Sequence, residues 1–279
     1  YAGTNKTVFI LDTKNISIKT LNTFYNRVPN SDFDFYNIAS SRIVSMTQSR
    51  WLNHDVLWIS PYGHGLAAFD IKTRAGFITP VFGKGLRYEH LINTIFIDSR
   101  QNIFCLTGRN GISQNFNRTS FADSIFNLPP VKQKTVLVDF SPIRANYLDE
   151  RIPDLPAEVF DMMEISEGVY WITSTSGGLF RLNLTNNTLT HFENSYPNMF
   201  GMERDAKGNL WIISSAGIEF FNTAKNTFYH FGPLDGIPDE GLQGHLYKDR
   251  NGYLFAGGKG YYLKFKPEEI KFNTAKPIA

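Results

Sequence analysis

The sequence predicts an all-β protein, a β-propeller built from four-stranded antiparallel sheets, or blades. One phrase of apolar strand, small-residue turn and second strand recurs along the chain at a spacing typical of propeller blades. Apolar residues alternate with period two over short runs, which favours strands over helices. Clusters of Gly, Asp and Asn interrupt these runs at short intervals, as turns between strands require.

The repeated phrase is clearest at Leu57–Asp70, Tyr170–Asn183 and Leu210–Asn222. Each copy has a Trp in its first strand, a Gly in its turn, and an apolar residue followed by Asp or Asn at its end. Two further copies carry Phe in place of Trp. A single blade cannot bury both of its faces, so we expect the anchor residues to fill the space between blades. The five anchors are Trp58, Phe104, Trp171, Trp211 and Phe255.

Each unit has the same internal order. An apolar strand such as Gly201–Asp205 comes first, and a tight turn such as Asp205–Asn209 follows. In this turn Asp accepts hydrogen bonds from its own backbone and Gly supplies a positive φ. The Trp strand and the third strand come next, and a more polar strand such as Asn226–Gly232 ends the unit. His191 and His230 then occupy equivalent positions in consecutive fourth strands. The repeat therefore explains the presence of both histidines without a role in metal binding.

The chain also predicts one partial unit and one insertion. Thr7–Asp12 aligns with Gly178–Asn183, which indicates a partial N-terminal blade. The long interval between Phe104 and Trp171 indicates an insertion over about residues 127–158, within which Lys134–Pro142 is expected to form a displaced fourth strand. The insertion is either a loop over the outer edge or a contact anchored by Arg144 and Tyr147.

We therefore expect one β-propeller domain over residues 1–279, with about five and a half blades in a ring of six or seven. The chain begins without Met inside a structural unit, so we expect it to be a fragment of a larger multi-domain protein.

Composition excludes several classes of function. Lys and Arg number 28 against 26 Asp and Glu, a net charge of +2 that argues against a nucleic-acid partner. The single cysteine, Cys105, excludes an internal disulfide and a cysteine-based zinc cluster. No histidine pair has zinc-motif spacing, and no phosphate loop or nucleophile elbow is present. We expect no metal and no cofactor.

The units "NLWIISSAGIEFFN" and "VYWITSTSGGLFRLN", with "DGIPDEGL" after the first of them, resemble the two-component-regulator propeller repeat. The family motif runs roughly N-L-W-I-G-T-x-x-G-G-L-x-R-F-[DN], followed by an aromatic strand and a G-[LI]-P loop. The resemblance covers Ile43 to Phe272 and is strongest around Trp58, Trp171 and Trp211. It is weaker at Phe104 and Phe255, where Phe replaces Trp.

This resemblance implies a periplasmic, ligand-sensing propeller of a membrane-bound hybrid two-component protein of Bacteroides type, responding to an oligosaccharide or another small ligand. It also implies an adjacent propeller and a β-sandwich in the same chain, and a homodimer. The segment itself is expected not to be an enzyme. A propeller glycosidase or polysaccharide lyase, or a protein-interaction scaffold, remains an alternative.

The turns between second and third strands and the loops that lead into first strands share one face of a propeller, where a ligand or partner would bind. Aromatic rings there stack on sugars, and Arg, His or Lys bind hydroxyl or carboxylate groups. The predicted ligand-binding residues are Tyr62, His64, Arg87, Tyr88, Arg109, Tyr196 and Lys259.

Overall fold

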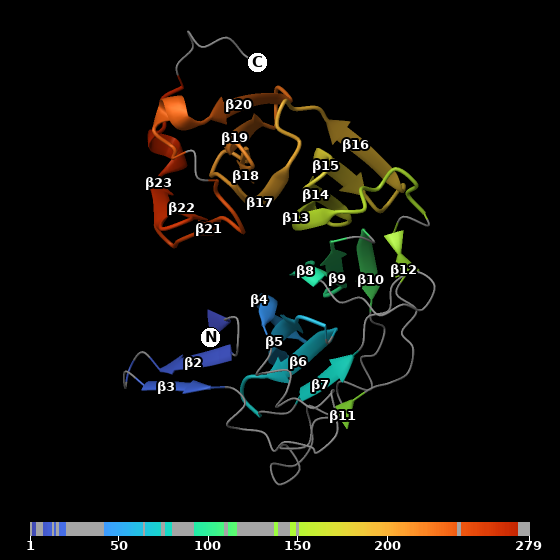
Figure 1. Ribbon diagram of the computed structural model, residues 1–279. Coiled ribbons are helices and arrows are strands. Elements are labelled where there is room, and N and C mark those ends of the chain that lie inside the picture. Colours follow the sequence, from blue (N-terminus) through green and yellow to red (C-terminus); the bar gives the residue numbers. More distant parts are fainter. Residues whose placement is uncertain are drawn as a thin grey trace. The chain divides into compact units, whose positions relative to one another are not determined.

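The structure is a computed structural model that describes residues 2–3, 8–12, 14, 17–20, 42–63, 65–73, 76–79, 92–108, 111–115, 137–138, 146–148, 151–238 and 241–272. Nearly all elements in these residues are strands, and they form six sheets, three of which have four antiparallel strands (Figure 1). The predicted all-β propeller class is confirmed. In this part of the chain, no helix has the length and apolar character needed to cross a membrane.

The chain divides into two compact units, Tyr1–Arg151 and Ile152–Ala279. We describe each unit by itself, and a single closed ring over residues 1–279 stays a prediction.

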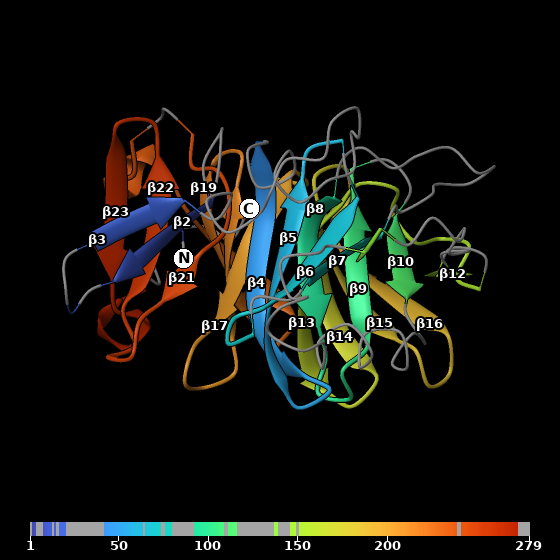
Figure 2. The same ribbon diagram turned by 90° about the horizontal axis from the view of Figure 1, so that it is seen from below.

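The first unit holds three sheets. Their spatial orders are β1-β2-β3, then β11-β7-β6-β5-β4, then β12-β10-β9-β8. Figure 2 shows strands β4 to β6 side by side. The bounds are β1 Ala2–Gly3, β2 Val8–Asp12, β3 Ser17–Thr20, β4 Ile43–Trp51, β5 His54–Pro61, β6 Leu66–Asp70, β7 Gly76–Thr79, β8 Ile92–Ile97, β9 Ile103–Thr107, β10 Ile112–Asn115, β11 Leu137–Val138 and β12 Asn146–Tyr147.

The core of this unit lies between the sheets of β4–β7 and β8–β10. Trp58 is 1% exposed there, and it meets the edge of Trp51 at 5.1 Å between ring centroids. Cys105 is fully buried in the same core, as expected of a small packing residue. Phe104, on the other face of β9, is also fully buried. The anchors Trp58 and Phe104 therefore occupy the packed positions that the repeat predicts.

The insertion differs from the prediction. Leu137–Val138 pairs in parallel with β7, as a fifth strand of the sheet before it. The fourth strand of the β8–β10 sheet is Asn146–Tyr147, which pairs antiparallel to β10. The expectation of a displaced fourth strand at Lys134–Pro142 is therefore wrong. Arg144 lies outside the described residues. Two-residue ladders give no alternation of apolar residues, so their partners are set by tertiary contacts.

The second unit is more regular. Its spatial orders are β13-β14-β15-β16, β17-β18-β19-β20 and β21-β22-β23 (Figure 1). Two single-turn 3-10 helices, η4 and η5, lie after β20 and after β23. The bounds are β13 Val159–Ser166, β14 Val169–Ser174, β15 Gly178–Asn183, β16 Thr188–Phe192, β17 Met199–Arg204, β18 Leu210–Ser214, β19 Gly217–Asn222, β20 Thr227–Phe231, η4 Pro233–Asp235, β21 Tyr247–Lys248, β22 Leu254–Gly258, β23 Tyr261–Phe265 and η5 Pro267–Glu269.

Apolar cores lie on both sides of the β17–β20 sheet. Trp171, 6% exposed, belongs to the core shared with β13–β16. Trp211, 2% exposed, belongs to the core shared with β21–β23. Phe255 departs from the prediction, because its side chain is only half-buried and contacts Tyr247 and Tyr262. Its neighbours along β22, Leu254 and Ala256, are the residues buried in the core.

The predicted aspartate turns are present. The Asp205 carboxylate accepts hydrogen bonds from the backbone N–H groups of Lys207 and Asn209, both at 2.9 Å. Asp98 and Asp249 make the same bonds in their own turns. Asp205 also lies 3.4 Å from the indole nitrogen of Trp211, so the turn helps to orient the anchor of its blade.

Candidate ligand-binding face

The predicted ligand residues fall into three groups. Tyr62 lies in the turn after β5, 51% exposed, with the Arg42 guanidinium 5.9 Å from its ring centre. Tyr196, between β16 and β17, and Lys259, between β22 and β23, lie in the second unit, with Tyr196 half-buried and Lys259 exposed. Four predicted residues lie outside the described residues: His64, Arg87, Tyr88 and Arg109.

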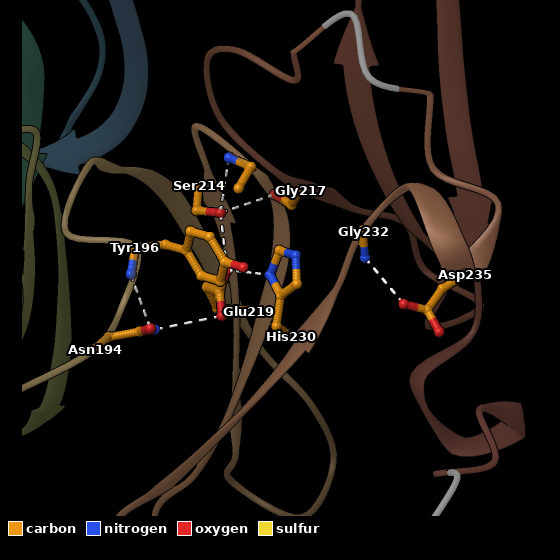
Figure 3. Close-up of polar contacts among 9 residues, drawn as sticks. Asn194, Tyr196, Ser214, Gly217, Glu219, His230, Gly232 and Asp235 are labelled. Carbon is orange, nitrogen blue, oxygen red and sulfur yellow. Dashed lines mark hydrogen bonds and ion pairs between the residues drawn. The ribbon is translucent and has the colours of Figure 1, made fainter. Parts of the chain in front are cut away.

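Tyr196 belongs to a hydrogen-bonded group that we call the Glu219 cluster, made of Asn194, Tyr196, Ser214, Glu219 and His230 (Figure 3). Its centre, the Glu219 carboxylate, is fully buried. The carboxylate accepts from Ser214 Oγ at 2.9 Å and from Asn194 Nδ2 at 3.3 Å, and it lies 2.7 Å from His230 Nδ1. These three donors replace the water that a buried carboxylate loses.

Position 219 is apolar in the neighbouring sheets. The strand pairings place Glu219 opposite Ile212 and His230, and they place Phe180 in the same way opposite Ile172 and His191. In that preceding sheet the His191 ring stacks on Phe180, with ring centres 4.5 Å apart. The fourth-strand histidines are thus equivalent, as predicted. Their partner changes from an aromatic ring to a buried carboxylate in one sheet, which marks that sheet as different.

The Glu219 cluster fixes the loop that carries Tyr196. Asn194 comes from this loop and donates to Glu219, and its Oδ1 accepts from the Tyr196 backbone at 3.1 Å. The Tyr196 ring stacks on the His230 ring at 4.2 Å between centroids (Figure 3). A ring that stacks on His230, in a loop fixed through Asn194, loses little entropy when a ligand binds to it.

A second polar contact of the second compact unit joins Asp161 and His245, next to Gly201. Asp161 in β13 accepts backbone hydrogen bonds from Met162 and Met202, both at 2.9 Å. It also lies 3.5 Å from Nδ1 of His245, which precedes β21. Gly201 in β17 lies between them. A Cβ at Gly201 would collide with the backbone of residues 244–246, so only glycine allows Asp161 and His245 to meet across this strand.

Two groups that interact with Asp161, the Glu203 carboxyl in β17 and the His245 imidazole, have shifted pKa values. Burial raises the pKa of the Glu203 carboxyl, because it disfavours the charged form. For His245, burial lowers the pKa, but the hydrogen bond and the charge of Asp161 together outweigh burial and raise the pKa above its ordinary value of 6.5. Shifted pKa values of this kind gather at functional sites as well as at structural ion pairs.

These directions predict a pH dependence. The folded protein binds the His245 proton more tightly than the unfolded chain does, so the ion pair stabilises the fold below the unfolded pKa. That contribution is lost as the pH rises through the raised pKa. Urea unfolding near about pH 5.5 and about pH 8.5 should therefore show a larger pH-dependent loss of stability in the parent than in His245→Gln. Equal pH dependence in the two proteins would show that the Asp161–His245 pair does not form.

The geometry of the Glu219 cluster suits binding rather than nucleophilic chemistry. A serine nucleophile needs its hydroxyl on a histidine that acts as base. Here Ser214 donates instead to Glu219, the same carboxylate that His230 contacts. Among the described residues, no three His, Cys, Asp or Glu side chains gather as a metal site.

The sequence analysis did not single out Glu219, Asp161 or His245. A signal for Glu219 was available, because it is the acidic residue in "GIEFF" at a position that is Phe180 in the preceding repeat. Asp161 and His245 have no such signal in the sequence. Their contact depends on the packing of β13, β17 and the segment before β21 around Gly201.

No protein-family model matches the chain, and a search of curated proteins finds no match. Solved structures do match. The extracellular domain of BT3049 from Bacteroides thetaiotaomicron, described as a hybrid two-component system, is 15% identical, with a TM-score of 0.63 over 96% of this chain and 34% of that chain. The extracellular domain of BT4673 from the same organism, also described as a hybrid two-component system, is 16% identical, with a TM-score of 0.55 over 84% and 31%.

A propeller-type enzyme also matches. A virginiamycin B lyase from Staphylococcus aureus is 12% identical, with a TM-score of 0.57 over 90% of this chain and 70% of that chain. At these identities the likeness shows the fold. The structural neighbours include extracellular domains of Bacteroides two-component sensors, which confirms the expected resemblance. The chain spans about a third of the length of those two domains.

Proposed function

We propose that this chain is part of the extracellular, ligand-sensing region of a membrane-bound hybrid two-component protein. The observation that carries the proposal is the match to the BT3049 extracellular domain over 96% of the chain. In this proposal the chain does no chemistry. Ligand binding favours one packing of the propeller against neighbouring domains, and the shift in population is passed across the membrane within a homodimer.

The proposed ligand is an oligosaccharide, bound on the loop face that carries Tyr196. Sugars have apolar ring faces that stack on aromatic side chains, and hydroxyl groups that bind polar neighbours. The Tyr196 ring, which stacks on His230 in a loop that Asn194 holds through the Tyr196 backbone, is a platform of this kind. The proposed location is the periplasm, because the sensor neighbours are extracellular domains.

A propeller enzyme is the second candidate, and the likeness to a lyase over 90% of the chain favours it. An enzyme of this kind would turn over the ligand that it binds. A protein-interaction scaffold would neither bind a glycan nor change one.

A thermal-shift screen of the full extracellular region against an oligosaccharide panel tests the proposal, because a ligand that binds only the folded state raises its melting temperature. We expect a concentration-dependent rise with one glycan class and no change in that glycan. Tyr196→Ala should remove the rise, and Tyr247→Ala, an exposed tyrosine on β21, is the matched control. Turnover of the glycan would support the proposal of a propeller enzyme. No response to any glycan would refute the proposal that the chain senses an oligosaccharide.

A further inference from the structure

His230, on the fourth strand β20, has one ring nitrogen that the Glu219 cluster does not use. Its Nδ1 lies 2.7 Å from the Glu219 carboxylate. A carboxylate only accepts hydrogen bonds, so the proton of this contact lies on Nδ1, and the neutral ring keeps a lone pair on Nε2. Among the residues that the structure describes, Nε2 has no hydrogen-bond partner, and the His230 side chain is 25% exposed. Nε2 is therefore an unused hydrogen-bond acceptor.

The corresponding nitrogen is used in the preceding sheet. There Nε2 of His191 donates to the carbonyl oxygen of Gly177 at 2.8 Å. That carbonyl belongs to the turn between β14 and β15, residues 175–177. The turn between β18 and β19, residues 215–216, is one residue shorter, and neither of its carbonyls bonds to His230. The shorter turn therefore leaves this nitrogen of His230 without the backbone partner that His191 has.

Gly232 keeps the space beside His230 Nε2 clear (Figure 3). A Cβ atom at this position would lie 2.6 Å from Nε2, and the three nearest atoms that it would meet all belong to the His230 ring. The backbone itself does not require glycine, because φ is −133° and lies in the extended region. The residue at the same distance after His191 is Glu193. Glycine at position 232 therefore leaves the edge of the imidazole uncovered.

Three differences from the preceding sheet thus meet at one ring. The residue opposite the histidine is Glu219 and not Phe, the adjacent turn is shorter, and the residue beside Nε2 is glycine. A carboxylate that bonds one nitrogen of a histidine fixes the ring orientation and makes the other nitrogen a better acceptor. The Tyr196 ring stacks on this same imidazole. The uncovered nitrogen is therefore part of the Tyr196 loop face.

We propose that His230 Nε2 accepts a hydrogen bond from a ligand hydroxyl group, and that this site selects uncharged sugars over acidic ones. The proposal rests on the proposed function and assigns the class of oligosaccharide bound at the Tyr196 face. Stacking uses the face of an aromatic ring, whereas this hydrogen bond uses the edge of the imidazole. An oligosaccharide, which has several rings and many hydroxyl groups, can make both contacts.

The charges near His230 disfavour an acidic sugar. A hydroxyl group has a proton to donate to Nε2, but an ionised carboxylate or sulfate has none. Glu219 bonds to the same ring, and the Asp235 carboxylate accepts from the Gly232 N–H at 3.0 Å. Both carboxylates repel a ligand anion, and repulsion of the wrong ligand is a common source of specificity.

The accessibility of Nε2 is tested first, without a glycan. Diethyl pyrocarbonate acylates the unprotonated nitrogen of a histidine that solvent reaches, and mass spectrometry locates the product. In the full extracellular region we expect acylation of His230 in the parent and its loss in Gly232→Ala, whose methyl group takes the space beside Nε2. Gly257→Ala is the matched control, because a Cβ there meets no atom within 4 Å and the residue has no positive φ.

The ligand class is tested with pairs of oligosaccharides that differ only in oxidation at C6, such as oligomers of galactose and of galacturonic acid. We expect the uncharged member of one pair to raise the melting temperature of the full extracellular region and the acidic member to have no effect. Titration calorimetry should show affinity for the uncharged sugar about tenfold weaker in Gly232→Ala, the loss of one hydrogen bond. Gly257→Ala should bind as the parent does.

The outcomes separate this proposal from the sensor proposal. Binding of acidic sugars alone, or equal affinity for the uncharged sugar in Gly232→Ala and the parent, would overturn the selection by His230 while the sensor proposal stands. Acylation of His230 at the same rate in the parent and in Gly232→Ala would show that Gly232 does not keep Nε2 open, whatever the glycan result. No response to any glycan would refute the oligosaccharide sensor and, with it, the selection of uncharged sugars.

Discussion

Replacing Trp211 with alanine should lower the free energy of unfolding by about 4 kcal/mol, near the upper range for core substitutions. The side chain is 2% exposed, and its ring contacts Phe220, Phe231 and Phe265. Alanine would leave a cavity in the core between the β17–β20 and β21–β23 sheets, and the rings around it would lose their shared neighbour. Urea unfolding followed by circular dichroism measures the change.

Phe255→Ala is the matched control for Trp211→Ala. The two residues occupy equivalent places in the repeat, but Phe255 is half-buried and contacts exposed tyrosines. We expect it to cost about 1 kcal/mol, because little apolar area returns to water. Equal losses of unfolding free energy in the two variants would contradict the conclusion that Trp211 lies in the core between the sheets and Phe255 does not.

Replacing Glu219 with alanine should cost about 3 kcal/mol, the upper end of what is expected when buried donors lose their acceptor. Ser214, Asn194 and His230 would all lose their shared acceptor, and Ser214 is fully buried. The loop with Tyr196 would also lose one of its two attachments. Urea unfolding reports the first effect, and faster amide exchange at residues 193–198 reports the second.

Glu219→Phe separates the two roles of this carboxylate. The substitution reproduces the Phe180–His191 stack of the preceding sheet, so we expect it to be less destabilising than Glu219→Ala. It cannot accept from Asn194, so exchange at residues 193–198 should rise as it does in the alanine variant. If Glu219→Phe leaves that loop as slow as in the parent, Glu219 does not hold the loop.

The parts of this fold that sequence predicts are those governed by local chemistry. Aspartate turns recur in three of the repeats, at Asp98, Asp205 and Asp249, and the structure has them where the sequence predicts. Four of the five anchor residues are buried as expected. Phe255 was predicted to be a buried anchor only because it aligns with the Trp residues of the other repeats. Such an alignment does not show whether another sheet covers the face of β22 on which Phe255 lies.

The parts that sequence does not predict depend on contacts between distant segments. Leu137–Val138 lies in a run of apolar residues typical of a strand, but its partner is β7, and no local pattern specifies a parallel pairing with a strand so far away in the sequence. The Asp161–His245 contact likewise depends on Gly201, which lies in the separate strand β17. Tyr196 was identified from its loop position, whereas the buried carboxylate that holds its loop was missed, since repeat analysis directs attention to residues that recur.

Among the strands that the structure describes, β23 pairs with β22 alone, and this open edge also bears on how the chain behaves in concentrated solution. Exposed strand edges are where folded proteins begin to join into aggregates, and lysine is a common means of preventing it. Lys264 lies within this edge strand, and its Nζ rests 4.3 Å from the centre of the Tyr253 ring. Removing that charge should reduce the solubility of the isolated chain more than removing a lysine from a turn.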